Sequence, residues 1–122
     1  LTFCTVLLLL TALQQNGDAM SFLVYMTVST PEEARSIGKE LVSQNLAACI
    51  NIIPGVESIY KWENEVQSAH EVVLIAKTSE AKVTALTQTA QKLHSYDVPC
   101  IVSLPITGGN PDFLSWIEHE TR

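Results

Sequence analysis

Residues that could bind a soft metal ion are few in this chain and lie far apart. It contains three cysteines and three histidines, and no Cys-x-x-Cys pair occurs. Structural zinc sites draw sulfur and nitrogen ligands from closely spaced positions, so the pattern argues against a site of that kind. Cys49 and Cys100 each lie inside an apolar run of strand character, where a buried free thiol is the usual state. In an exported protein a Cys49–Cys100 disulfide is possible if the geometry permits it.

A second group of residues has the composition of a small-ligand pocket. Aromatic side chains together with a lone acid and a lone base can line a ligand cleft. The candidates are Tyr60, Trp62, Glu71, Lys77 and Tyr96. The alternative is aromatic packing and salt bridges that only hold the structure together. The sequence leaves both interpretations open.

Sequence motifs give no support for catalysis or for binding of nucleic acid. The chain has no nucleophile elbow, no glycine-rich phosphate loop and no paired-histidine helix motif. Seven Lys and Arg against 13 Asp and Glu give a net charge of -6, and no two basic residues are adjacent. Because the catalytic motifs are missing, we do not expect an enzyme. Because an acidic surface without a basic patch repels phosphate backbones, we do not expect a nucleic-acid-binding protein either.

The first 20 residues differ in character from the rest of the chain. Residues 1–13 are uncharged and contain six leucines. Crossing a bilayer takes about 20 apolar residues, so this run is too short, but it suits the apolar region of a secretory signal. The alternative is a translated upstream region with Met20 as the true start. We therefore separate a hydrophobic leader, residues 1–20, from a folded domain over 21–122. A real leader implies the secretory pathway or a membrane, whereas a start at Met20 implies the cytoplasm.

The folded domain must supply the strands that position these side chains. Apolar and β-branched runs predict strands over 22–28, 71–78 and 98–104. Two further strand segments lie on either side of Pro54-Gly55, which is a turn dipeptide. Residues 63–70 are polar and are interpreted as a connector.

Helix signals are equally distinct. Thr30 as cap, Pro31 at the first position and Glu33 form a capping box that predicts a helix to about residue 44. A second helix is expected from Ser79, followed by a loop at residues 94–97. Asn110 and the proline after it predict a short helix at the C-terminus.

The resulting order is βαββαβ plus a terminal helix, which predicts an α+β, ferredoxin-like fold. Right-handed crossovers place both main helices on one face of an antiparallel sheet. The strands are nevertheless apolar on both faces, so a lone domain would expose a large apolar surface. We therefore expect an obligate oligomer.

Short motifs throughout the folded domain resemble those of the divalent-cation tolerance protein family, CutA, over about residues 22–119. The motifs are Pro31-Glu32-Glu33-Ala34, Leu46 to Val56, Ser58 to Trp62, Glu71, Lys77-Thr78, His94-Ser95-Tyr96, Leu104-Pro105, Gly109-Asn110 and Leu114 to Ile117. The resemblance implies a tight homotrimer whose sheets face inward. It also implies copper tolerance and divalent-metal binding, as in bacterial relatives, or membrane anchoring of acetylcholinesterase, as in mammalian ones.

The copper site that the resemblance implies is only partly present. The family's cysteine and two histidines fall on Val28, Leu93 and His94, so one ligand of three is kept. We take His94 and Cys49 as candidate contacts for a weakly bound Cu(II) or another divalent ion. The alternatives are that His94 is a loop histidine hydrogen-bonded to backbone and that Cys49 is a core thiol.

Our leading hypothesis is therefore a homotrimer that binds divalent metal weakly and contributes to metal tolerance or homeostasis. The alternative is a non-enzymatic trimeric scaffold or regulator that binds a small ligand or a protein partner. That alternative includes a role in membrane anchoring or trafficking through the leader.

Overall fold

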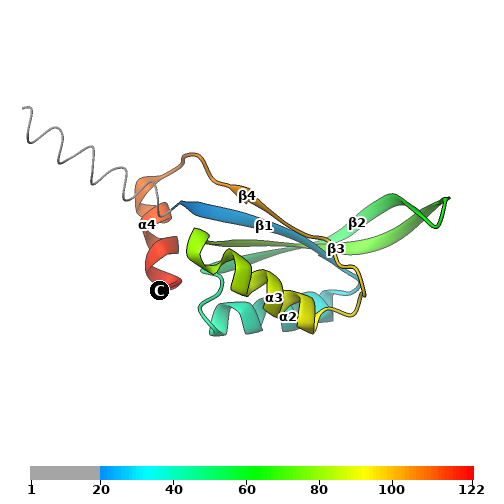
Figure 1. Cartoon of the computed structure of the whole chain (residues 1–122), viewed down its shortest axis with the longest axis horizontal. Coiled ribbons are helices and arrows are strands. Elements are labelled where there is room, and N and C mark those ends of the chain that lie inside the picture. The colour runs from blue at the N-terminus through cyan, green and yellow to red at the C-terminus, as the bar shows by residue number, and fades with distance from the viewer. Residues whose placement is uncertain (1–19) are drawn as a thin grey trace, which may run out of the picture.

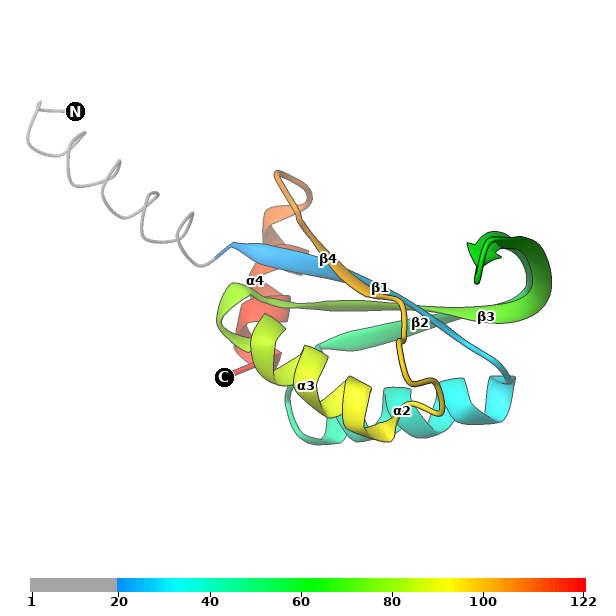
Figure 2. The same ribbon diagram turned by 45° about the vertical axis from the view of Figure 1, so that its right-hand side comes forward.

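One antiparallel sheet with helices on one face forms the folded domain (Figures 1 and 2). The computed structural model describes residues 20–122. The strand order in the sheet is β2-β3-β1-β4, so β1 lies between β3 and β4. This is the split βαβ arrangement, and the prediction of an α+β, ferredoxin-like fold is confirmed. The elements are β1 (Ser21–Val28), α2 (Pro31–Ser43), β2 (Cys49–Trp62), β3 (Glu65–Ser79), η1 (Glu80–Lys82), α3 (Val83–Leu93), β4 (Ile101–Pro105) and α4 (Pro111–Glu120).

The hydrophobic core lies between the sheet and the two main helices. Side chains alternate along a strand, so every second residue of β1 and β3 points at the helices. Val24, Met26 and Leu74 are at most 1% exposed. They belong to one cluster with Leu41 of α2 and Leu86 of α3. Burial of this cluster is the main stabilisation of the fold.

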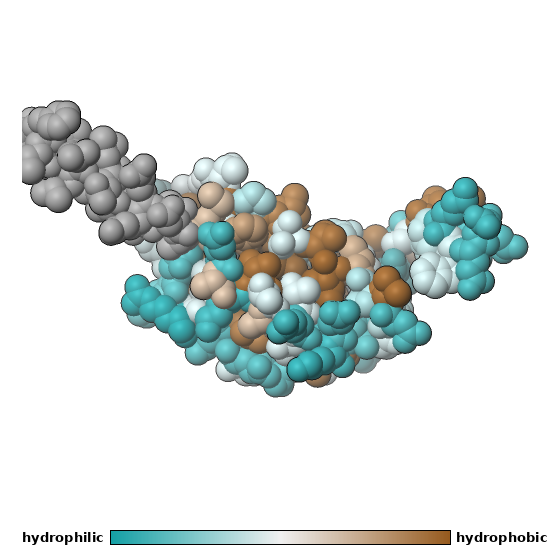
Figure 3. Space-filling model, viewed as in Figure 1, coloured by the Kyte–Doolittle hydropathy of each residue, from teal (hydrophilic) through white to brown (hydrophobic). Residues whose placement is uncertain are grey.

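The other face of the sheet carries apolar side chains that none of the helices within residues 20–122 covers. We call it the open sheet face and define it by Leu23, Tyr25, Ile53, Ile75, Val102 and Leu104. Leu23 is opposite Leu104, and Tyr25 lies between Ile75 and Val102. Val102 and Leu104 are each 51% exposed. Apolar residues are visible over β4 and the middle of the sheet in Figure 3.

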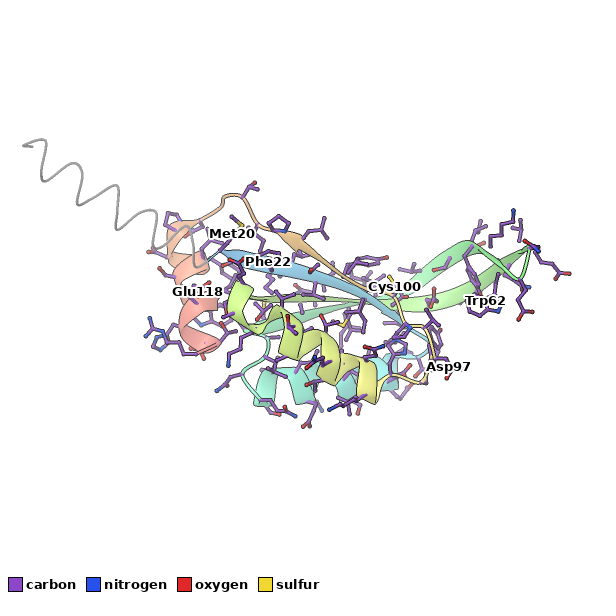
Figure 4. The ribbon with its side chains drawn as sticks, in the orientation of Figure 1. Met20, Phe22, Trp62, Asp97, Cys100 and Glu118 are labelled. Atoms are coloured by element: carbon purple, nitrogen blue, oxygen red, sulfur yellow. The ribbon has the colours of Figure 1, made fainter. Side chains whose placement is uncertain are left out.

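A long β-hairpin extends beyond the sheet. We call residues 56–70 the arm; its strands pair from Val56 opposite Glu71 to Trp62 opposite Glu65. Glu63 and Asn64 both have positive φ, of 50° and 64°, as a two-residue turn of the primed type requires. Figure 4 places Trp62 far out on the arm, away from Cys100 and Asp97 near its base.

Two of the predicted irregular segments are strand in the structure. Residues 65–70 are part of β3 and not a connector, because polar side chains suit a hairpin with both faces exposed. Pro54-Gly55 is not a turn between two strands. The register passes from Ile53 opposite Val73 to Val56 opposite Glu71, so these two residues form a β-bulge within β2. Gly55, with φ 76°, supplies the conformation that the bulge needs.

Helix starts agree closely with the sequence prediction. The Thr30 hydroxyl accepts the Glu33 N–H at 3.1 Å, and the Asn110 side chain accepts from the first turn of α4. The second helix begins later than expected: Ser79 ends β3, a single 3-10 turn follows, and α3 starts at Val83. The last strand is also shorter, Ile101–Pro105 rather than 98–104.

The two body cysteines differ from expectation. Cys100 is exposed and Cys49 only half-buried, and both are free thiols. The positions of both cysteines can be compared along β1. Cys49 is level with Leu23, because both lie opposite Lys77 of β3, and Cys100 is level with Thr27, whose N–H its carbonyl accepts. The two positions are four residues apart along β1, about 13 Å. A disulfide needs Cα atoms within about 7 Å, so the structure of one chain does not permit this bridge.

The predicted leader lies outside the described residues, apart from Met20. Within residues 20–122, no helix has both the length and the apolar character needed to cross a membrane.

Candidate functional site

Three segments that are distant in sequence meet where the arm joins the sheet. They are the first turn of α2, the part of β3 next to the bulge, and the loop at residues 94–97 that follows α3. The loop is held by three contacts, which reach the end of β1, the start of α2 and β3. They join His94 to Thr27, Ser95 to Glu33 and Tyr96 to Glu71. In this cluster three of the predicted site residues come together, because Tyr96 contacts both His94 and Glu71.

His94 is buried, and both of its ring nitrogens have backbone partners. Nε2 is 2.7 Å from the carbonyl oxygen of Thr27, and Nδ1 is 3.0 Å from the backbone nitrogen of Tyr96. A carbonyl can only accept and an N–H can only donate, so Nε2 carries the hydrogen and Nδ1 accepts. The imidazole is therefore neutral in one tautomer. The interpretation of His94 as a loop histidine hydrogen-bonded to backbone is the one that the structure supports.

Glu33 connects the start of α2 to the same loop. Its Oε1 accepts from the Ser29 N–H and hydroxyl at 3.3 and 3.2 Å, and its Oε2 accepts the Ser95 N–H at 2.8 Å. Burial works to raise the pKa of this carboxyl, but hydrogen bonds from Ser95 and Ser29 outweigh it. The net result is a lowered pKa, so the carboxylate is the stable form at neutral pH.

Tyr96 connects the loop to β3. Its hydroxyl donates to Glu71 Oε2 at 3.1 Å, and its ring centroid lies 4.7 Å from that of His94. Burial, the hydrogen bond to Glu71 and the negative charges of Glu71 and Glu33 raise the pKa of Tyr96 to about 12. The phenol therefore stays protonated as a donor. The cluster therefore brings together the carboxyl groups of Glu33 and Glu71, a protonated phenol and an imidazole whose two nitrogens both have backbone partners.

Only part of the predicted ligand cleft assembles within one chain. Glu71 and Tyr96 are in contact, and Tyr60 is close enough for its charge to affect the pKa of Tyr96. Trp62 is 54% exposed near the end of the arm. Lys77 lies six residues along β3 from Glu71, about 20 Å away, and donates to the Asn51 side chain.

The two predicted metal contacts are not brought together. His94 lies against Thr27, and Cys49 lies at the other end of the sheet, opposite Lys77. Among residues 20–122 no group of three or more His, Cys, Asp or Glu side chains could hold a metal ion. These residues of one chain therefore offer no ready site for a tightly bound metal, and the metal roles of His94 and Cys49 stay predictions.

Glu33 and Ser95 are functional candidates that sequence reasoning missed. Glu33 is recognisable from sequence only as a helix-capping residue, and its carboxylate does reach back to the segment before α2. Its second contact, to Ser95, joins residues 62 positions apart. No local pattern encodes that pairing.

The fold and site together define an α+β protein with an uncovered apolar sheet face and a polar cluster at the base of a hairpin arm. Comparison with known families agrees with the sequence motifs. The profile described as "CutA1 divalent ion tolerance protein" matches residues 22–120. The chain belongs to this family.

Relatives with established names are similar over most of the folded domain. The divalent-cation tolerance protein CutA of Thermus thermophilus is 44% identical over 102 residues, which cover 84% of this chain and 99% of that protein. The solved structure of the Thermus thermophilus protein has a TM-score of 0.83 and covers 84% of this chain and 100% of that one. The crystal structure of CutA1 from Oryza sativa also has a TM-score of 0.83, at 44% identity, covering 85% of this chain and 95% of that one.

Plant relatives are longer than the matched region. The chloroplastic CutA proteins of Arabidopsis thaliana and Oryza sativa are 44% and 45% identical over 102 residues, or 84% of this chain. The match spans 56% and 58% of their lengths. The chain therefore spans little more than half of the length of these plant proteins, and any function that it shares with them is treated below as a proposal.

Proposed function

We propose that this chain is a homotrimeric divalent-cation tolerance protein that acts by binding ions weakly and not by catalysis. The observation that carries the proposal is the family match over residues 22–120, which covers all the described strands and helices except the first residue of β1. The name of the family and of the Thermus thermophilus relative refers to tolerance of divalent cations.

The open sheet face supports the homotrimer. It places exposed Val102 and Leu104 beside Leu23 and Tyr25 across neighbouring strands. Contiguous apolar surface of this kind is rare on a monomer and is typical of interfaces. A second copy is a chemically matched cover, because it presents the same apolar side chains.

Weak binding follows from how His94 is held. An ion that bound Nδ1 would have to displace the Tyr96 N–H, and one that bound Nε2 would have to displace the Thr27 carbonyl. Leaving a buried polar group without a partner costs about 1–3 kcal/mol, which reduces affinity by about one to two orders of magnitude. We therefore expect an ion such as Cu(II) to bind with low affinity.

Titration calorimetry of the full chain with Cu(II) tests the metal role. We expect saturable, weak binding that is lost in His94→Ala and kept in His70→Ala, whose histidine is exposed on the arm. Absence of saturable binding, or equal binding by both variants, would contradict the proposal.

A second candidate is a regulator or scaffold that binds a small organic ligand or a protein partner. The observation in its favour is the half-buried Tyr96–Glu71 pair at the base of the arm, whose phenol is kept protonated. A melting-temperature screen separates the two candidates. Stabilisation by an organic metabolite and by no divalent metal favours the regulator.

Membrane anchoring or trafficking is the form of this alternative that depends on the leader. Within residues 20–122 no helix could span a bilayer, so this role would need the apolar residues 1–13. Fractionation of cells that express the full-length gene tests it. Recovery in the soluble cytoplasmic fraction would contradict anchoring.

A further inference from the structure

Helix α2 and the edge strand β2 leave an open groove between them. The groove has a volume of about 380 Å³. A Cβ atom added at Gly38 would lie 3.2 Å from Ile50 Cγ2, so the helix approaches the strand closely at this point. The side chains on either side of it are mostly apolar. The lining residues are Arg35, Gly38, Lys39, Val42, Ser43, Ile50 and Ile52.

The groove combines an apolar lining with a positive rim. Val42 and Ile52 in it are 39% and 37% exposed. Arg35 and Lys39 are one helical turn apart on α2, so both lie on the side facing the groove. Arg35 is 3.9 Å from Glu32, whereas Lys39 has no ion pair among residues 20–122. These two are among only seven basic residues in a chain of net charge -6. The matching occupant is apolar and acidic.

Helix α4 presents a surface of this composition. Phe113 and Trp116 are 43% and 39% exposed, and their ring centroids are 5.5 Å apart. Asp112 and Glu120 lie four residues before and after Trp116, so they share its side of the helix. The result is an exposed aromatic stripe with an acid at each end.

The stripe runs along an exposed flank of α4, beside the side of the helix that is fixed against the body. Ile117 is fully buried, and the Thr121 hydroxyl donates to the Ser79 hydroxyl at 2.9 Å. α4 packs against β3 and β1, whereas the groove lies at the β2 edge of the sheet. In Figure 1 α4 lies at the end where β1 begins. One copy therefore does not fill its own groove with its own stripe.

We propose that the α4 stripe of one copy docks into the α2–β2 groove of another copy. Aromatic side chains at the centre and charged pairs at the rim are the usual composition of a specific interface. The two surfaces are different patches of the same chain, so the contact is head-to-tail and closes into a ring when the rotation allows it. The inference rests on the proposed homotrimer and assigns it a helix-in-groove contact separate from the open sheet face.

Site-directed cross-linking tests the contact in the full chain. The three native cysteines are replaced by Ser, and Ser43→Cys in the groove is combined with Asp112→Cys or His119→Cys on α4, so that either helix direction is covered. With a short bis-maleimide, at least one pair is expected to give covalent oligomers ending at a closed ring. Ser43→Cys alone is expected to give none.

The matched control combines Ser43→Cys with Gln88→Cys, an exposed position on α3. Cross-linking of both α4 pairs no stronger than this control, in a protein that native mass spectrometry finds trimeric, overturns the docking and leaves the trimer standing. A monomer in native mass spectrometry overturns both.

A charge substitution gives a second measure. Lys39→Glu places like charges against the acidic ends of the stripe, and we expect the concentration for half-dissociation of the oligomer to rise about two- to fivefold. Lys92→Glu on α3 changes the net charge equally and is expected to leave it unchanged. Equal effects of the two variants overturn the docking.

Discussion

The two faces of the sheet have very different surroundings. On the helix side, Val24 and Leu74 are fully buried against α2 and α3. On the open sheet face, Val102 and Leu104 are each half-exposed although they are just as apolar. Exposure of the second face to water costs free energy that no helix or strand in the described part of the chain removes. One face therefore holds the protomer together, and the other is the face that we propose for contact between copies.

The largest expected effect comes from a charge on the open sheet face. Leu104→Glu would bury an unpaired carboxylate in the proposed interface, which costs about 3–5 kcal/mol per contact. We expect this variant to elute as a monomer in size-exclusion chromatography and to keep the circular dichroism spectrum of the wild type. Gln88→Glu on exposed α3 is the control. Unchanged elution of Leu104→Glu would mean that the open face is not an interface.

On the helix-covered face a truncation should destabilise the protomer itself. Leu74→Ala removes a fully buried side chain and should lower the free energy of unfolding by about 2–5 kcal/mol. Leu93→Ala, at a position that is 45% exposed, should cost less than half as much. Urea denaturation at matched protein concentration measures both. Equal losses would contradict the assignment of the core to this face.

His94 should contribute to stability through its two backbone contacts. His94→Ala leaves the Thr27 carbonyl and the Tyr96 N–H without their partner, which should lower the free energy of unfolding by about 1–3 kcal/mol. Exposed His119→Ala should change it by less than about 0.5 kcal/mol. Urea denaturation of the two variants compares them. A similar result for both would show that the loop is not held by this ring.

The pKa of Tyr96 tests the contact between the loop and β3. Glu71→Gln removes a negative charge and the charged hydrogen-bond acceptor, so the pKa should fall from about 12 towards the ordinary 10.0 of tyrosine. Ultraviolet absorbance of the phenolate, in a background with Tyr25 and Tyr60 replaced by Phe, follows the titration. A pKa that does not move would place Glu71 away from the phenol in solution.

The smallest effect is expected at Glu33. Its lowered folded pKa means that its contribution is present above the unfolded pKa and is lost as the pH falls through the folded pKa. Because the carboxylate is partly exposed, we expect less than about 1 kcal/mol. Glu33→Gln should therefore be slightly less stable than the wild type at pH 7, and the difference should vanish in acid. A difference that is independent of pH would contradict the ionised contact.

Local signals in the sequence predicted the parts of the fold that local chemistry determines. Thr30 and Asn110 cap helices as expected, because a cap depends on a few consecutive residues. Pro54-Gly55 also reads locally as a turn, yet pairing with β3 makes it a bulge. The difference lies in the partner strand, which the local pattern does not contain.

The site was less accessible to sequence reasoning than the fold. Tyr96 and Glu71 were named from their residue types, and they are in contact. Lys77 and Trp62 were named on the same grounds and lie elsewhere in the chain. Glu33 was assigned only to a cap, because its contact with Ser95 depends on the packing of α2 beside the end of α3.

Native mass spectrometry of the full-length wild-type chain tests the central claim most directly. If the open sheet face is an interface between copies, the spectrum at micromolar concentration should be dominated by three times the mass of one chain. A spectrum dominated by the single-chain mass would contradict the account, because the apolar face would then be exposed to water in the native protein.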